Sequence, residues 1–214
     1  MTLFIGMFFK PKKGGFFFNH SKIIFMALNL LKTIEKNLGF AELKKVDPNT
    51  QEIKANTIDS EDKLNQAALP AVLVSLYKYS RNDEGAEQIL CGDTSQNWLQ
   101  KILEDTSDSA VTRVANYAHV SNEKAIERMN LIAQESVKII REKNPVAVKD
   151  VKNMIAAEKP TILMYLPPAL QMGDLLNDET IDDRTHKMEG PVSGFMNKFG
   201  EIFNQSEKSK QDKS

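Results

Sequence analysis

Apolar residues recur at helical spacing along most of this chain. The first such segment ends at Gly39 and has four apolar residues spaced three or four positions apart: Leu28, Leu31, Ile34 and Leu38. Residues with this spacing share one face of an α-helix, so the segment is predicted to be an amphipathic helix. The polar stretch 42–57, which contains Asp47-Pro48-Asn49, predicts a loop after it.

The next segment predicts a helix that is buried on all sides. Asp59 or Ser60 can cap its start, and Val72–Leu76 is apolar nearly all round. Pro70 interrupts this segment. Because a proline removes one backbone hydrogen bond and clashes with the preceding turn, we expect a kink or a new helix start at that residue.

Caps and periodicity predict further helices as far as Leu170. We expect a helix from Asp83 to Leu90, one that contains Trp98 and Leu103, one from about Asp108 to Ala118, a long one capped by Ser121 and ending near Lys143, one opened by Asn144-Pro145, and one opened by Pro160. Outside Ile5 to Phe9 no stretch has the alternation typical of a strand. The predicted fold class is therefore all-α, a compact multi-helix bundle of about eight or nine helices.

The pattern also divides the chain. We expect a leader of doubtful status (1–25), a helical domain (26–176), an acidic linker (177–190), a separate C-terminal amphipathic helix (191–204) and a disordered tail (205–214). The leader matches a signal peptide poorly, and an amphipathic helix starts cleanly at Met26. Met26 is therefore an alternative native start. No uninterrupted apolar run approaches the roughly 20 residues of a membrane helix.

Three segments resemble, in order, the YidB-like family, a bacterial family of unknown function. They are Ala67–Leu73 with Glu84-Gly85-Ala86 behind it, Val114–Ser121 leading into Ala125, and Glu158-Lys159 through Leu166-Pro167-Pro168 to Leu175-Leu176. Together they span roughly residues 27–180. The resemblance implies an all-helical module and brings no catalytic residue with it.

Charge argues against nucleic-acid binding. The formal net charge of the 214 residues is −1, and four lysines lie in the first 25 residues, so the rest of the chain is mildly acidic. An acidic body without a basic stripe repels phosphate backbones. The single cysteine, Cys91, has no partner for an intramolecular disulfide, which fits a reducing compartment. Because it follows Ile89-Leu90, we expect a buried thiol rather than a reactive one.

Reactive motifs are not found in the sequence. His20, His119 and His186 lie in three different regions, so they offer no local framework for zinc, and we expect His119 to be a helix-end residue. There is no glycine-rich phosphate loop and no Gly-x-Ser-x-Gly elbow. We expect no enzymatic activity and no cofactor.

The segment 191–204 gives the strongest functional signal. One side of the expected helix carries the candidate partner-binding residues Phe195, Met196, Phe199, Ile202 and Phe203. Our leading hypothesis is a cytoplasmic protein–protein interaction module, with self-association possible. One alternative is a membrane-peripheral or envelope-associated protein that uses its Phe-rich terminal segments, and another is an enzyme with an unrecognised helical site. The stripe can also fold back onto the body.

Overall fold

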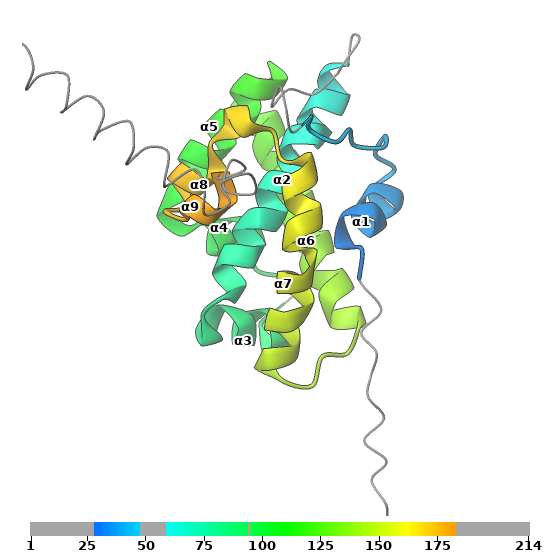
Figure 1. The fold of residues 1–214 in the computed structure, drawn as a ribbon, viewed down its shortest axis with the longest axis vertical. Helices are drawn as coiled ribbons and strands as arrows, with labels where there is room; N and C mark the ends of the chain where they lie inside the picture. Colours follow the sequence, from blue (N-terminus) through cyan, green and yellow to red (C-terminus); the bar gives the residue numbers. More distant parts are fainter. Residues whose placement is uncertain (1–27, 48–58, 94, 183–214) are drawn as a thin grey trace, which may run out of the picture.

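The computed structural model describes residues 28–47, 59–93 and 95–182, and within these ranges all regular structure is helical. The expected all-α multi-helix bundle is thereby confirmed (Figure 1). In chain order the α-helices are α1 (Leu30–Leu38), α2 (Ser60–Ser80), α3 (Asp83–Cys91), α4 (Trp98–Leu103), α5 (Ser107–Ala118), α6 (Asn122–Glu142), α7 (Val148–Tyr165), α8 (Met172–Leu175) and α9 (Glu179–Asp182). Short 3-10 turns lie at Glu104–Thr106 and Pro168–Leu170.

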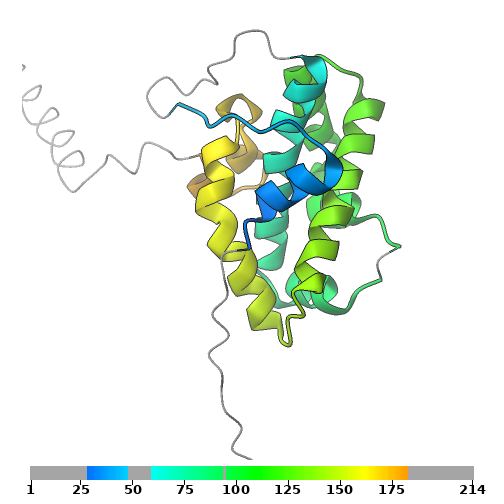
Figure 2. The same ribbon diagram turned by 90° about the vertical axis from the view of Figure 1, so that its right-hand side faces the viewer.

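Helix α2 is the centre of the bundle. Every residue from Leu64 to Leu76 is buried, and the helix contacts α5, α6 and α7. Figure 2 shows α1 lying across α2 between α6 and α7, and α1 contacts all three of these helices. The prediction of a central helix buried on all sides is confirmed. It continues through Pro70 without a new start, because packing on all sides holds the two halves together.

The prediction of two helices after Asn144 is wrong. One helix, α7, begins at Val148 and runs through Pro160 to Tyr165. Asn144 adopts a left-handed backbone with φ 52° and belongs to the loop after α6. The start of α7 is fixed instead by Asp150, whose carboxylate accepts hydrogen bonds from the N–H groups of residues 146 and 147 at 3.1 and 3.0 Å.

Most helix ends follow the expected capping rules. Asp59 and Ser121 cap α2 and α6 as predicted. Asn82 caps α3 one residue before its predicted start at Asp83, and Asn97 caps α4. Gly39 ends α1 with φ 68°, a backbone conformation that glycine adopts without strain.

Two arginines join helix ends to their neighbours. Arg141 of α6 donates from Nε to the carbonyl of Ile89 at 2.6 Å, and its guanidinium lies 5.3 Å from the ring centroid of Trp98. Arg113 of α5 donates to the carbonyls of Leu170 and Gln171 at 3.1 and 2.5 Å. The carbonyls of Ile89 and Leu170 lie in the last turn of a helical element, where intrahelical donors run out, and the carbonyl of Gln171 also accepts from the N–H of Leu175 at 3.2 Å.

The packed body extends beyond residue 176, where the sequence pattern sets the end of the helical domain. Helix α9 lies beside α8, and its Ile181 is completely buried. Asp178, just before α9, is also buried. The described chain therefore ends in a packed element, which fixes the point from which residues 183–214 depart.

Candidate functional site

The outer side of α7 is the most unusual surface in the described residues. From Asn153 to Met164 its exposed residues all lack charge, and they are Asn153, Ala156, Ala157, Pro160 and Met164, whereas Lys149, one turn earlier on the same side, is also exposed. Their spacing of three or four places them on one side of the helix. The opposite side, with Val151, Ile155 and Ile162, is buried against the bundle. We call these five exposed residues the α7 outer face.

The other long surface helix has a different exposed side. Between Asn122 and Glu142, the exposed side of α6 includes Glu123, Lys124, Glu127 and Lys138. Charged residues are typical of the solvent side of an amphipathic helix. Ile126 and Leu131 of α6 are also exposed, at 41 and 44 %, but they lie among these charges. The exposed side of α6 is therefore charged, whereas the α7 outer face is not.

The chain enters the described body beside the middle of α7. Glu158 is only 2 % exposed, and its two carboxylate oxygens accept hydrogen bonds from the N–H groups of Asn29 and Leu30 at 3.0 and 2.9 Å. These donors belong to the first turn of α1, where a helix offers unpaired N–H groups and favours negative charge. The buried carboxylate therefore holds the start of α1 against α7.

The chain leaves the described body beside the next residue of α7. Lys159 donates from Nζ to Oγ1 of Thr180 at 2.7 Å, and this hydroxyl donates to Oδ1 of Asp178 at 2.5 Å. Arg81 of α2 completes the cluster with an ion pair to Asp178 at 2.8 Å. Burial by itself raises the pKa of Asp178, but the Thr180 hydrogen bonds and the charges of Arg81 and Lys159 outweigh it and lower that pKa below its ordinary value.

A third contact joins the segment after α1 to the same part of the fold. Gln66, buried in α2, accepts from the N–H of Lys44 at 2.8 Å and donates to the carbonyls of Lys44 and Tyr165 at 3.1 and 2.9 Å. The N–H of Val46 donates to the carbonyl of Met164 at 2.9 Å. Residues 43–46 are thus fixed against α2 and the end of α7.

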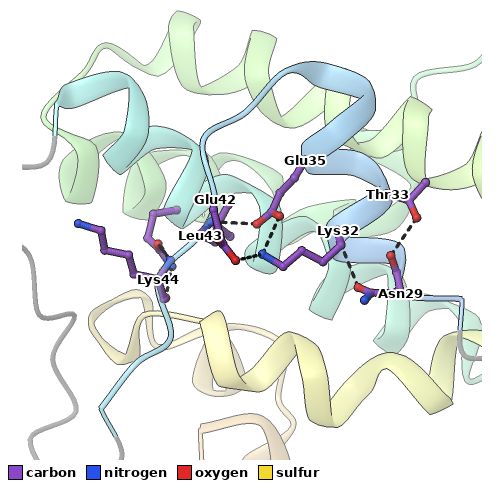
Figure 3. Close-up of polar contacts among 8 residues, drawn as sticks. Asn29, Lys32, Thr33, Glu35, Glu42, Leu43 and Lys44 are labelled. Carbon is purple, nitrogen blue, oxygen red and sulfur yellow. Dashed lines mark hydrogen bonds and ion pairs between the residues drawn. The ribbon is translucent and has the colours of Figure 1, made fainter.

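A charged cluster closes this segment over α1 (Figure 3). Lys32 lies 2.9 Å from the carboxylate of Glu35 and 2.8 Å from that of Glu42, and Glu35 also accepts from the N–H of Leu43 at 2.9 Å. Partial burial lowers the pKa of Lys32, but hydrogen bonds to Glu42 and Glu35 outweigh it, so the net pKa is raised. These side chains bind backbone groups and one another, and their geometry is structural.

The sequence did not single out these buried polar residues. Glu35 follows Ile34 on a buried side, Gln66 lies in an apolar run, and Glu158 lies between Met154 and Ile162 on the inner side of α7. A polar residue at a buried position of a helical pattern is a signal in itself, since it needs a partner. The pattern marks the position but does not identify that partner.

The candidate reactive residues have ordinary surroundings where the structure describes them. His119 ends α5 with φ 56° and is exposed, as expected for a helix-end residue. The prediction for Cys91 is wrong, because its side chain is exposed at the end of α3. Ile89 faces the core, and a residue two positions later points to nearly the opposite side of the helix. His20 and His186 lie outside the described residues.

The described ranges contain neither a metal-binding cluster nor a membrane-spanning helix. There, no three His, Cys, Asp or Glu side chains gather in a way that could hold a metal ion. None of the described helices combines the length and apolar character needed to cross a bilayer.

The candidate partner-binding residues, Phe195, Met196, Phe199, Ile202 and Phe203, lie outside the described residues. The structure does fix the point from which they are tethered, which is Asp182 at the end of α9. This point is coupled to α7 through the Thr180–Lys159 hydrogen bond. The candidate binding segment is thus connected to an element that is hydrogen-bonded to α7.

Comparisons of this chain with protein-family models, with curated proteins and with solved structures found no match. The resemblance to the YidB-like family therefore stays a prediction.

Proposed function

We propose that this chain is a non-enzymatic, cytoplasmic interaction protein that binds a protein partner through the apolar side of residues 191–204. The observation that carries the proposal is the repeat of Phe195, Phe199 and Phe203 every four residues, which forms a single stripe on a helix. An amphipathic helix with such a stripe binds by laying it into an apolar groove of its partner.

The buried polar groups of the described body bind other parts of the same chain. Glu35 binds the backbone N–H of the segment just after α1, Gln66 and Glu158 bind backbone N–H groups of more distant segments, and Asp178 pairs with Arg81. A catalytic site needs polar side chains that converge on a substrate. These buried polar groups are instead used to hold one segment of the chain against another.

A peripheral membrane role would use the same phenylalanines. Between 195 and 204 the predicted helix carries one lysine, Lys198, and one acidic residue, Glu201. Helices that bind anionic bilayers have a strongly cationic polar side, which this segment lacks. The charge pattern therefore favours a protein groove over an anionic lipid surface.

The proposal predicts that Phe199→Asp abolishes partner capture and that Asn197→Asp does not. Both substitutions add a carboxylate to the same segment, but only Phe199 is on the apolar side, where a charge cannot be desolvated without a large cost. The measurement is affinity capture from native lysate by the tagged full-length chain, with the captured proteins identified by mass spectrometry.

Equal capture by both variants would refute the proposed binding face. Sedimentation of the same variants with anionic vesicles separates the membrane alternative. If vesicle binding depends on Phe199 while protein capture does not, the segment is a lipid-binding element and the proposal fails.

A further inference from the structure

The uncharged outer face of α7 is exposed, and the same helix holds both ends of the described chain through other side chains. Consecutive residues of α7 hold those ends, since Glu158 binds the first turn of α1 and Lys159 binds Thr180 of α9. The exposed residues Ala156, Ala157 and Pro160 lie within about one helical turn of this pair. A segment that leaves the body at Asp182 therefore starts two residues after a hydrogen bond to α7.

The length of chain beyond Asp182 matches this face. Residues 183–190 can span up to roughly 28 Å when extended, which is about the length of the whole of α7. As a helix, 191–204 would be about 21 Å long, and the α7 outer face from Asn153 to Met164 is about 18 Å long. The connection reaches the face, and the two helices are of similar length.

The side chains of the two surfaces are complementary. The α7 outer face presents small side chains at Ala156 and Ala157, a proline ring at Pro160 and the thioether of Met164, which is 42 % exposed. Large side chains facing small ones allow two helices to approach closely. A phenylalanine stripe fits such a face, and methionine sulfur makes favourable contacts with aromatic rings.

We infer that residues 191–204 dock on the α7 outer face of their own chain and that a protein partner competes with α7 for the phenylalanine stripe. The existence of a partner rests on the proposed function. The inference adds that α7 covers the phenylalanine stripe before the partner binds. Docking within one chain is favoured by the short connection, which raises the effective concentration of the segment to the millimolar range.

Hydrogen exchange of the full-length chain, read by mass spectrometry, tests the docking. Ala157→Glu places a charge on the α7 outer face, whereas Gln134→Glu places the same charge on the exposed side of α6. Both positions are exposed, so the fold tolerates both changes. Ala157→Glu is expected to make exchange in residues 192–204 roughly tenfold faster, with no change for Gln134→Glu.

Three results in residues 192–204 would overturn the docking, and a fourth concerns residues 1–27. They are fast exchange in 192–204 of the wild-type chain, protection that Ala157→Glu leaves unchanged, and protection that rises with protein concentration, which would identify a second copy as the occupant. A change in residues 1–27 instead of 192–204 would assign the face to the leader and also overturns it.

Capture from lysate with the same variants separates the docking from the proposed function. Because Ala157→Glu releases the stripe, it is expected to capture more partner than the wild type. If no variant captures a protein while the exchange pattern holds, the proposed function fails and the docking stands. If capture depends on Phe199 while exchange ignores Ala157→Glu, the proposed function stands and the docking fails.

Discussion

Gly85 permits a close backbone approach between α2 and α3. A Cβ at this position would lie 2.1 Å from the carbonyl oxygen of Tyr79 and 2.8 Å from Oδ1 of Asn82. The N–H of Gly85 also donates to Oδ1 of Asn82, the cap of α3, at 2.5 Å. The absence of a side chain allows the end of α2 to turn directly into α3.

Gly85→Ala is expected to destabilise the protein by about 1–3 kcal/mol, because the new methyl group meets backbone that must shift. In an ordinary helix the same change stabilises by up to about 1 kcal/mol, so the sign is diagnostic. Urea unfolding followed by the fluorescence of Trp98, which is buried, measures the free energy of unfolding.

Glu87→Ala serves as the control for this prediction. It is an exposed change in the same helix, and we expect it to alter stability by no more than about 0.5 kcal/mol. A Gly85→Ala variant more stable than the wild type would show that α2 and α3 are not in such close contact.

Single residues show how far the sequence can predict the site. Gln66 and Glu158 occupy buried positions of the observed helices, although neither was predicted as a site residue. Their partners are backbone groups up to 99 and 129 residues away along the chain. Which segments meet depends on the packing of whole helices, so these contacts cannot be predicted from the local pattern.

At the scale of elements, the local rule for proline fails at Pro160, where α7 continues without a break. A proline inside a helix costs about 3 kcal/mol, and this local rule predicts a kink or a new start at Pro70 and a new helix at Pro160. Helix α2 also buries Leu64, Leu69 and Leu73 completely, and each buried leucine contributes about 1.5–3 kcal/mol. Burial along the helix outweighs the local cost. The helix ends, governed by nearby caps, were predicted more accurately.

Helix α9 is attached to the body by an ionised carboxylate, which makes the attachment pH-dependent. Because the pKa of Asp178 in the folded protein lies below its value of about 3.9 in an unfolded chain, ionised Asp178 stabilises the fold above about pH 4. This contribution is lost as the pH falls from about 4 through the folded pKa. We expect Asp178→Asn to lower the free energy of unfolding by about 1–2 kcal/mol at pH 7 and by progressively less towards pH 3.

Urea unfolding at a series of pH values checks this expectation. Asp174→Asn is a suitable control, since that carboxylate is 74 % exposed beside Arg113 and such surface pairs contribute at most about 1 kcal/mol. If the free energy of unfolding of Asp178→Asn stays below that of the wild type by the same amount from pH 7 to pH 3, the charge of Asp178 does not hold α9.

At the scale of the whole molecule, the described helices form one core around α2, and both ends of the described chain meet α7. The candidate binding stripe lies beyond this core in sequence. We therefore expect the body to fold without help from the phenylalanines. A docked state about tenfold more populated than the undocked state adds only about 1.4 kcal/mol to the free energy of unfolding of the body.

The free energy of unfolding of Phe199→Asp in the full-length chain, measured in urea with Trp98 fluorescence, tests this central claim most directly. Leu73→Ala provides the reference for a core loss, since Leu73 is fully buried in α2 and its truncation is expected to cost about 2–5 kcal/mol. We predict that Phe199→Asp loses no more than about 1.4 kcal/mol and keeps its helical circular dichroism. A loss of about 3 kcal/mol or more, or an unfolded chain, would place the stripe in the core and contradict its role as a binding face.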